Sequence, residues 1–531
     1  MSAPRDAIVI GAGVNGLVAA ACLAKAGRKV QVLERSETTG GQSRLLEFAP
    51  GFRADPLDRD AGWLPPPVAR ELGLTGLERV IPRATVAVPA GEGEWLVLSS
   101  DAARTAQAIR PHSARDAGKW GVFCGRIAAL SGFLEALYTL PPPDIDTTAP
   151  GELLSLLGVL RKLRGLGRAD MIELLRTVPM SVAELLDDWF ELDPLKAAIG
   201  ASGVTEIRQG PRSGGTAFVL LHHHVGAAPG ALRGRGYWRA GPNALTRAAE
   251  TAARGLGVEI RAGADVARVL VKDDRVTGVA LAGGEEIAAA TVLSSADPAR
   301  TLLGLVDPVW LDPEFLLALR NIKYRGSAAK VLYALDALPD FPGLPLAGEA
   351  FAGTVTLSTS LEELERAADA AKYGRVSETP FVEIELPTLR WPALAPEGKH
   401  VLVAHAQWAP YALREGPWNP ARREALGDAV TAAIARVAPC FGERVRQRAV
   451  LAPPDLEARY GLTEGAVTQG EMTLDQILFM RPVAGASRYA MPLEGLFLCG
   501  AGTHPGTGIP GGPGWLAARR VLSGRRHGAR P

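Results

Sequence analysis

The sequence has few cysteines, no excess of either charge and only one long uncharged run. Its 531 residues contain four cysteines, at positions 22, 124, 440 and 499, and no two of them form a C-x-x-C pair. This spacing excludes a redox-active dithiol, argues against a zinc site or a disulfide framework, and suits a reducing cytoplasm. Lys and Arg together number 58 and Asp and Glu 57, so the charge balance gives no case for a nucleic-acid partner.

The one uncharged run that approaches the length of a transmembrane helix covers residues 7–24. Three glycines and Asn15 interrupt this run, and the basic residue just before it, Arg5, is offset by Asp6. A signal peptide has a basic leader, and a transmembrane helix gains nothing from such interruptions. We therefore expect a soluble, cytoplasmic protein, whose length is divided between two interleaved domains.

The same run has the strand–turn–helix pattern of a dinucleotide-binding unit. A short apolar strand over Ala7–Ile10 leads into Gly11, Gly13 and Gly16, which have G-x-G-x-x-G spacing. The first glycine permits a tight turn, the second lets the backbone approach a pyrophosphate, and the third lets the helix pack on the strand. The helix N-terminus offers unpaired N–H groups and the positive end of its dipole to the phosphates.

Two features after this helix indicate that the nucleotide is FAD. A second strand, Lys29–Leu33, ends at Glu34, close to where such sites place a carboxylate on the ribose hydroxyls. The stretch 40–44, GGQSR, follows with a glycine pair for close backbone approach and with Arg44, which can bind a pyrophosphate through two N–H groups. A surface turn with a solvated arginine is the alternative. An NAD site does not need this second element, whereas an extended FAD does.

A second glycine-rich turn lies near the other end of the chain. The apolar strand Leu496–Cys499 leads through the turn 500–514 into a helix over Trp515–Leu522. A turn of this kind before a helix forms another anion or dipole site, so we expect the two chain ends to meet in one domain. In a flavoprotein it would lie at the isoalloxazine end. Because Pro510 has no N–H, the donors there would be the backbone groups of Ile509, Gly511 and Gly512.

A central segment joins these pieces without adding a second nucleotide site. A helix is expected over Ala244–Leu256, followed by short strands over Val258–Ile260, Val266–Val271, Val276–Leu281 and Thr291–Ser294. No second G-x-G-x-x-G has a strand and an acid around it, so no separate nicotinamide domain is expected. Electrons that leave a reduced flavin would then pass to oxygen, a quinone or another soluble carrier.

These four pieces together resemble the phytoene dehydrogenase-like flavoproteins, in the superfamily of amine oxidases and carotenoid desaturases. The likeness is greatest to the branch named for a pyridine nucleotide-disulphide oxidoreductase domain, a name that does not fit the cysteine pattern. The stretches that carry the likeness are MIELLRTVPMSVAELLDDWF (171–190), GTAFVLLHHH (215–224), GYWRAGPNA (236–244), LDQILFMRP (474–482) and residues 496–514.

The resemblance implies an α/β protein with non-covalent FAD. A Rossmann-type FAD-binding domain of the GR2 class would be interleaved with a mixed-sheet, helix-capped substrate domain. The FAD domain would comprise residues 1–80, 235–300 and 485–531, and the substrate domain residues 81–234 and 301–484. The residues carried over to the cofactor are Gly11, Gly13, Val14, Asn15, Gly16, Glu34, Arg35, Gly41, Gln42, Ser43, Arg44, Val266, Gly500, Ala501, Gly502, Gly508, Ile509 and Gly511.

The sequence departs from the family pattern at two positions. The wider superfamily often has Gly-Asp where this chain has Gly500-Ala501, so a carboxylate for the ribityl chain is missing here, as it tends to be in the closest branch. That branch often has a histidine near position 469, where this chain has Gln469. A histidine general base is therefore not available at that point.

Candidates for the chemistry are few. His222, His223 and His224 are three of only eight histidines. One of them is either buried and hydrogen-bonded or lines the substrate cavity. A metal site would need a further ligand, and we expect no metal site here. His223, Tyr411 and Glu471 are the cavity candidates, the last two by family position alone.

The stretch 151–176 is rich in leucine and in basic residues. Leu153, Leu154, Leu156, Leu157, Leu160 and Leu163 are accompanied by Arg161, Lys162, Arg164 and Arg168. Such a helix packs in the substrate domain, caps a tunnel for an apolar substrate, or lies on an anionic membrane.

The sequence thus favours an FAD-dependent oxidoreductase that forms or reduces a C=C bond in an isoprenoid, polyene or acyl chain. An amine or amino-acid oxidase is the first alternative, although no arginine is clearly placed to bind a substrate carboxylate. A redox-neutral flavin isomerase or a flavin-bound interaction protein is the second. The sequence leaves the oligomeric state open.

Overall fold

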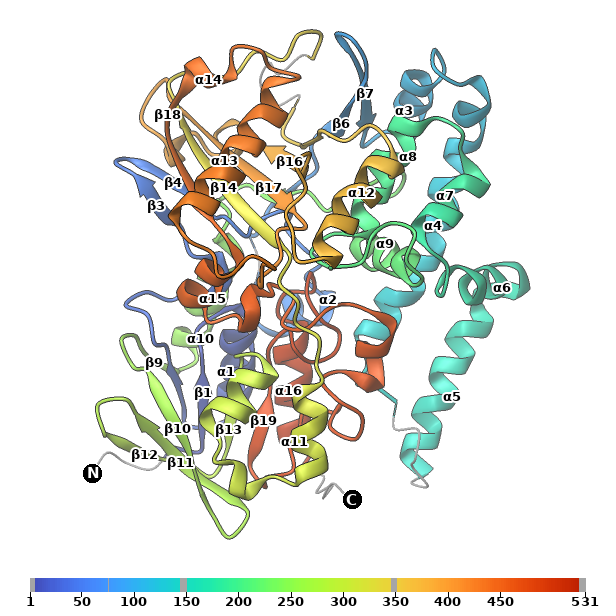
Figure 1. The fold of residues 1–531 in the computed structure, drawn as a ribbon. Helices are drawn as coiled ribbons and strands as arrows, with labels where there is room; N and C mark the ends of the chain where they lie inside the picture. The colour runs from blue at the N-terminus through green and yellow to red at the C-terminus, as the bar shows by residue number, and fades with distance from the viewer. Residues whose placement is uncertain (1–4, 75, 144–149, 345–350, 525–531) are drawn as a thin grey trace.

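The computed structural model describes residues 5–74, 76–143, 150–344 and 351–524, with side chains from residue 157 onward in the helix that begins at Pro150. The elements form two halves, each built around its own sheet (Figure 1). A parallel sheet occupies the lower half of that view, a larger sheet occupies the upper half, and a group of helices covers one side of both.

The lower sheet has five parallel strands in the order β19-β13-β1-β2-β9. They are β1 (Ala7–Ile10), β2 (Val30–Leu33), β9 (Glu259–Arg261), β13 (Val292–Ser294) and β19 (Leu496–Leu498). Strand β13 pairs with β1 on one side and with β19 on the other, so the two chain ends meet in one sheet. The expected Rossmann-type α/β architecture is confirmed.

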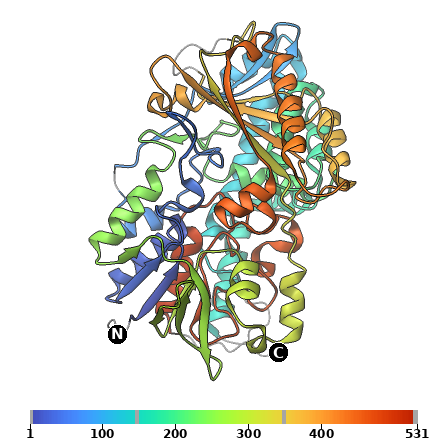
Figure 2. The ribbon, with the colours of Figure 1, turned by 60° about the vertical axis from the view of Figure 1, so that its left-hand side comes forward.

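Both faces of this sheet are covered. Alternate residues of each strand point to opposite sides, so the two faces pack against different elements. Val9 and Val32 pack against helices α1 (Val14–Lys25), α10 (Ala244–Gly255) and α16 (Gly512–Leu522). Ile8 and Leu33 pack toward an antiparallel sheet of β10 (Val266–Lys272), β11 (Arg275–Leu281) and β12 (Glu286–Ala288). Figure 2 shows this small sheet beside the nucleotide-binding strands.

The segment that follows β13 stays with this half of the molecule. A π-helical turn, Arg300–Leu305, and helix α11 (Pro313–Arg320) place Leu302 and Leu319 in the same apolar cluster as Val269 of β10. Residues 301–320 therefore pack on the nucleotide-binding half, although the sequence assigned them to the substrate domain. The other predicted domain boundaries stay predictions.

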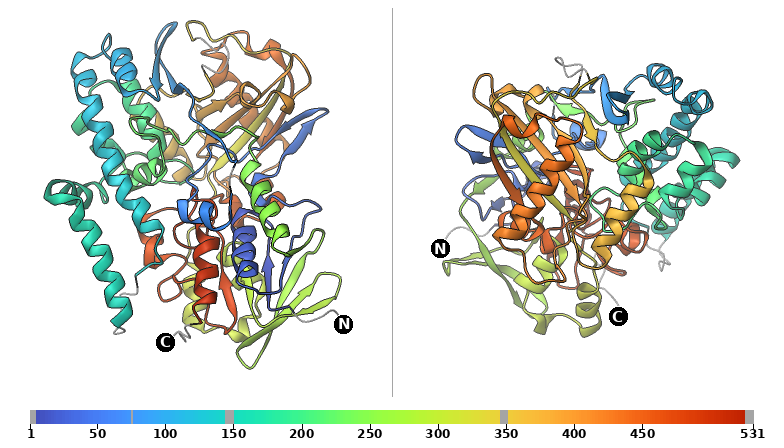
Figure 3. Two further views of the ribbon diagram at one scale, coloured as in Figure 1. Left: turned by 180° about the vertical axis from the view of Figure 1, so that it is seen from behind. Right: turned by 45° about the horizontal axis from the view of Figure 1, so that its top comes forward.

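The upper sheet is mixed and has seven strands in the order β18-β14-β17-β16-β15-β6-β7. They are β6 (Ala84–Gly91), β7 (Glu94–Ser99), β14 (Ala328–Leu335), β15 (Thr354–Thr356), β16 (Phe381–Glu385), β17 (His400–Gln407) and β18 (Val445–Leu451). Only the β15–β6 pair is parallel. Helix α13 (Pro420–Ala435) covers one face, as Figure 3 shows in its right-hand view.

Helices close the other side. They are α3 (Ala102–Ile109), α4 (Ala114–Tyr138), α5 (Pro150–Gly165), α6 (Gly167–Thr177), α7 (Val182–Trp189), α8 (Asp193–Gly203), α9 (Thr216–His224) and α12 (Leu361–Lys372). Helix α4 is the one described helix long and apolar enough to span a membrane by length and composition. Its Trp120, Phe123 and Leu130 are buried in the apolar cluster between these helices and β6–β7, so α4 is a core helix of this cap.

The remaining elements are short. They are β3 (Leu46–Ala49), β4 (Phe52–Ala54), α2 (Pro66–Glu71), β5 (Arg79–Val80), β8 (Tyr237–Trp238), α14 (Phe441–Arg444) and α15 (Pro453–Tyr460). The strands β3 and β4, and the loop after them, run from the nucleotide-binding half to the large sheet, where β4 contacts β17.

Candidate active site

A cavity of about 380 Å³ begins at the carboxyl ends of the parallel strands and extends to the helical cap. Gly11, Glu34, Ser295 and Ala501, which follow β1, β2, β13 and β19, all line it. The carboxyl edge of a parallel sheet is where such folds bind nucleotides, because the strand order reverses there. The far wall comes from the helical cap and from the loop after β4.

Glycines shape the nucleotide end of the cavity. Gly11 has φ +93°, and a side chain on Gly16 would strike the Gly11 carbonyl oxygen, so these two positions set the turn and the packing of α1 on β1. A Cβ on Gly41 would lie 2.8 Å from the Cα of Gly13. The two glycine turns predicted from the sequence therefore touch one another, and Gly13 and Gly41 both line the cavity.

Glu34 is buried at this end, with 6% of its surface exposed. Its two carboxylate oxygens accept hydrogen bonds from the backbone N–H of Ala12 (2.8 Å) and of Ser36 (3.0 Å). Each oxygen keeps a further lone pair, so the carboxylate can still accept from ribose hydroxyls. Val266 lines the cavity next to this position, as the resemblance implied.

Three arginines, Arg35, Arg44 and Arg300, line the adjoining stretch. The guanidinium of Arg44 is held by the carbonyls of Gly41 (3.2 Å) and Arg459 (3.0 Å). Within the described parts of the chain, none of the three has a carboxylate at ion-pair distance. Unpaired guanidiniums beside a glycine turn fit a pyrophosphate. The residues present thus fit FAD: Glu34 would hold its adenosine half, and Gly13, Gly41 and Arg44 would hold its pyrophosphate.

The second glycine turn also lines the cavity, and it contacts the first turn of α1. Gly508 has φ +72°, and a Cβ there would lie 2.8 Å from Nη1 of Arg235. The N–H of Gly511 donates to Oδ1 of Asn15 (2.8 Å) and that of Gly512 to the Ile509 carbonyl (3.1 Å). Of the three donors proposed from the sequence, the Ile509 N–H alone has no acceptor in the described chain.

Several predicted residues support the turns without lining the cavity. The predicted residues that do not line the cavity are Gly16, Gly500, Gly502 and Gly511. Those that do line it include Val14, Asn15, Arg35, Gln42, Ser43, Ala501, Gly508 and Ile509. Gln469, where the family often has a histidine, accepts from the Gly502 N–H (2.8 Å) and donates to the Ser295 carbonyl (3.3 Å). Its amide therefore links the turns after β13 and β19.

The three consecutive histidines form the last turn of α9. His222 is fully buried; Nε2 lies 2.9 Å from the Thr507 carbonyl and Nδ1 lies 2.7 Å from the Tyr138 hydroxyl. A carbonyl only accepts, so Nε2 carries the proton and Nδ1 accepts from Tyr138. Burial lowers the pKa of His222 to about 3, which keeps the ring neutral. His222 thereby anchors the second glycine turn to the cap.

His223 lines the cavity. Desolvation, followed by the charges of Arg235, Arg59 and Arg233, lowers its pKa well below the ordinary value, so its ring is neutral. Tyr411 and Glu471 do not line the cavity: the Tyr411 hydroxyl donates to Glu457 (2.5 Å), and Glu471 accepts from the Arg208 N–H (2.8 Å). Among the described residues no group of three His, Cys, Asp or Glu could hold a metal ion.

Beyond the second glycine turn the cavity wall is densely charged. Arg59, Arg233 and Arg235 line it together with Asp55, Asp58, Asp60 and Glu206. The sequence showed no arginine clearly placed to bind a substrate carboxylate, and the structure places these three in the cavity wall. The sequence carried only a weak signal, a run of alternating acids and one arginine at 55–60, which is equally typical of a surface loop.

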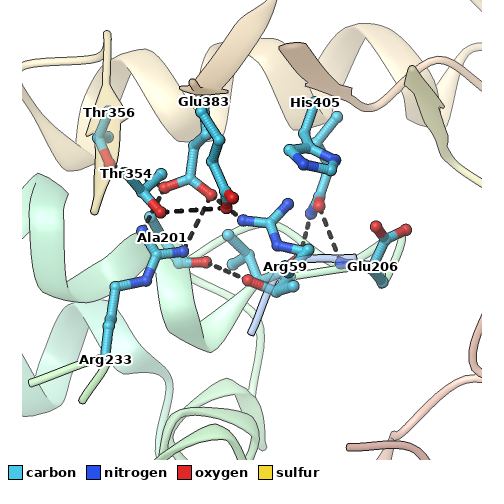
Figure 4. Close-up of polar contacts among 12 residues, drawn as sticks. Arg59, Ala201, Glu206, Arg233, Thr354, Thr356, Glu383 and His405 are labelled. Carbon is cyan, nitrogen blue, oxygen red and sulfur yellow. Dashed lines mark hydrogen bonds and ion pairs between the residues drawn. The ribbon is translucent and has the colours of Figure 1, made fainter. Parts of the chain in front are cut away.

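An acid on the large sheet organises two of these arginines (Figure 4). Glu383 of β16 accepts from Nη1 (2.5 Å) and Nη2 (2.9 Å) of Arg233, from Thr356 (2.8 Å) and from Arg59. Burial alone would raise the pKa of Glu383, but the two guanidiniums lower it to about 2. The carboxylate is therefore ionised and fixed.

A second ion pair lies beside the first. The Lys330 ammonium contacts the Glu206 carboxylate and donates to Nδ1 of His405 (3.1 Å). Asp55, held by the N–H of Leu57 (2.9 Å), has its pKa raised to about 7 by burial, and the pKa of Asp58 is raised well above its ordinary value by burial and by Asp55.

The chain matches known flavoproteins over nearly its whole length. The family model described as "Flavin containing amine oxidoreductase" matches residues 15–522. Pyridine nucleotide-disulfide oxidoreductase domain-containing protein 2 of Rattus norvegicus is 34% identical over 543 residues, which cover 97% of this chain and 93% of the relative. Hydroxyneurosporene desaturase of Rhodobacter capsulatus is 26% identical over 544 residues, with 99% of each covered.

Solved structures share the fold. Putrescine oxidase bound to putrescine superposes with a TM-score of 0.59 at 15% identity, covering 98% of this chain and 99% of that one. The resemblance inferred from the sequence motifs is confirmed by the family and by the relatives.

Proposed function

Because the chain belongs to the flavin containing amine oxidoreductase family and is an FAD-dependent oxidoreductase, we propose that it oxidises or reduces a carbon–carbon bond of a lipophilic substrate. The bond would lie in an acyl or isoprenoid chain. The observation that carries the proposal is one continuous cavity, which runs from the nucleotide-binding turn past the second glycine turn to a wall built by the other half of the molecule. Similarity to a hydroxyneurosporene desaturase over both full lengths supports the choice of a C=C bond.

Bound FAD supplies a hydride acceptor or donor at N5. The chain must then accept or supply the accompanying proton when CH–CH becomes C=C or the reverse. A group transfers protons best when its pKa is near the working pH. Asp55, with a pKa of about 7, meets this condition, whereas His223 is a weak base there.

Two further residues, His222 and Arg235, hold the walls of the cavity in place. The neutral ring of His222 holds Thr507, and with it the turn that contains Gly508 and Ile509. Arg235 donates to the carbonyls of Val225 (2.9 Å) and His222 at the end of α9, and a Cβ on Gly508 would lie 2.8 Å from its Nη1, so Arg235 packs between the cap and the same turn. Both contacts are buried and keep the two walls of the cavity together.

Helices α5 and α6 supply a further part of the proposal, contact with a membrane surface. Leu157, Leu160, Ile172 and Leu175 are more than half exposed, and basic side chains accompany them. Figure 3 shows α5 standing away from the body in its left-hand view. Apolar and basic side chains together suit an anionic bilayer, from which a lipophilic substrate would enter. Oxygen or a quinone would complete the electron transfer.

The test is anaerobic reduction of the FAD-loaded protein by saturated acyl and isoprenoid chains, with putrescine as a control amine. The proposal predicts loss of the visible flavin absorbance with at least one chain, and mass spectrometry of that chain should show loss of a pair of hydrogens. A flavin that stays oxidised with every chain but is reduced by putrescine would replace the proposal with amine oxidation.

A further inference from the structure

The wall of the cavity beyond the second glycine turn carries hydrogen-bond donors that the chain itself does not use. Arg59 and Arg233 line the cavity and keep 18% and 15% of their side-chain surface exposed, whereas Glu383, which binds both, is buried behind them. A guanidinium has five N–H donors. Arg233 donates two of these hydrogen bonds to Glu383, and Arg59 contacts the same carboxylate. Both arginines therefore keep N–H groups that can donate to a further acceptor.

Arg59 and Arg233 differ from the neighbouring cations because they share a single ion-pair partner. Lys330 is paired with Glu206, Arg390 with Glu385 (2.9 Å), and Arg235 lies 3.8 Å from Asp60. Burial raises the pKa of Asp58 well above its ordinary value and that of Asp55 to about 7. Arg59 and Arg233 are ion-paired with the same carboxylate, Glu383, while Glu206 and Glu385 also attract the Arg59 guanidinium.

Two further features indicate a built site. Arg233 (φ +54°) and Glu206 (φ +57°) have left-handed backbone conformations, which are strained for non-glycine residues and persist only where the surrounding structure holds them. Ser202 lines the cavity, is 4% exposed, and its hydroxyl has no hydrogen-bond partner among the described residues. A buried hydroxyl of this kind needs a partner.

We propose that Arg59 and Arg233, positioned by Glu383, bind a carboxylate at one end of the substrate. The substrate class is then a carboxylic acid with an apolar chain, not a neutral hydrocarbon. This inference rests on the proposed function for the apolar chain of the substrate. It does not depend on which reaction the flavin carries out. A neutral polyene would leave the remaining N–H groups of both guanidiniums and the Ser202 hydroxyl without partners, which is costly in a buried site.

The experiment is a binding titration of the FAD-loaded protein with laurate, methyl laurate and dodecanol, followed by equilibrium dialysis and by the shift of the flavin spectrum. Laurate should bind about tenfold or more tightly than the ester or the alcohol, since only the acid offers a charged partner. Equal binding of the three compounds to the wild-type protein would by itself overturn the inference.

Variants assign the preference to the arginines. Arg233→Gln and Arg59→Gln should each remove most of the preference for laurate, and Arg233→Lys should restore part of it, because a charge returns without the paired donors. Arg212→Gln is the matched control, since Arg212 is exposed and paired with Glu362 away from the cavity. Unchanged preference in folded Arg59→Gln and Arg233→Gln would overturn the assignment.

The outcomes separate the two proposals. Selective laurate binding, with a flavin that no saturated chain reduces and a reduced flavin that no unsaturated chain reoxidises, keeps the carboxylate site and rules out the proposed reaction. Reduction by a neutral polyene, with no preference for acids, keeps the reaction and ends the carboxylate site.

Discussion

At the scale of single residues, Glu34 illustrates how one side chain serves both the fold and the ligand. It ends β2, its oxygens accept two backbone N–H groups, and it lines the nucleotide end of the cavity. The sequence indicated this residue through its spacing from Gly16. That signal is local, because a strand, a turn and a helix fix the position within a few tens of residues.

Glu34→Ala is expected to weaken FAD binding. Each hydrogen bond from a ribose hydroxyl to a charged carboxylate contributes about 1.5–3 kcal/mol, so affinity should fall at least about tenfold. The fold should survive, since water entering the cavity can accept from the Ala12 and Ser36 N–H groups. FAD titration of the apoprotein, with circular dichroism as the folding control, measures this; unchanged affinity would leave Glu34 with a structural role alone.

His222 gives a prediction about pH. Its folded pKa, about 3, lies below the ordinary value of 6.5, so between these values the unfolded chain binds the proton and the folded chain does not. The stabilisation is therefore complete above pH 6.5 and is lost as the pH falls from 6.5 toward 3, at up to about 1.4 kcal/mol per pH unit.

Urea unfolding at several pH values between 7.5 and 4.5 measures this slope. Wild type should lose stability on acidification more steeply than His222→Gln, which has no proton to take up. His112→Gln, at a ring that is not fully buried, serves as the matched control. Equal slopes in wild type and His222→Gln would show that His222 does not contribute.

Arg59, Arg233 and Glu383 show where prediction from the sequence fails at this scale. Arg233 and Glu383 are 150 residues apart, and Arg59 and Glu383 are 324 apart. Their pairing depends on how the large sheet meets the loop after β4, and no local pattern encodes that. The same reason explains Glu471, which the family position suggested as a cavity residue and the structure places on the backbone of Arg208.

At the scale of elements, strands and helices with strong periodicity were predicted within a few residues. The exception of interest is α16, which begins at Gly512, three residues before the predicted start, because Pro513 is tolerated in the first turn of a helix. The α5–α6 stretch is different: its leucine pattern allowed packing or exposure, and only the tertiary structure distinguishes the two. Leu153, Leu154 and Leu156 lie outside the residues whose side chains the structure describes.

Leu157→Ser with Leu160→Ser should reduce association with anionic liposomes and leave the melting temperature and the flavin spectrum nearly unchanged. Both leucines are exposed, so their loss removes apolar contact with lipid, about 1.5–3 kcal/mol each when buried, but little core packing. Liposome co-sedimentation checks this. Leu317→Ser, at an equally exposed leucine on α11, is the control and should not change association. A fall in melting temperature with unchanged association would assign α5 to ordinary packing.

At the scale of the whole molecule, the site exists because two halves meet. The nucleotide end is built by strands from both chain ends, and the charged wall by the loop after β4 and by the segments after α8 and α9, with Glu383 of the large sheet behind it. The family resemblance predicted this architecture, but residues 301–320 pack on the nucleotide-binding half, because the apolar face of α11 matches the small antiparallel sheet. Which half a connecting segment joins depends on such tertiary contacts.

The measurement that tests the account most directly is the visible spectrum of the purified protein before and after acid precipitation. The account predicts a yellow protein that releases FAD into the supernatant, since glycine turns, Glu34 and unpaired arginines hold the cofactor by non-covalent contacts. A colourless protein that cannot be reconstituted with FAD, or one that binds a nicotinamide nucleotide in its place, would contradict it.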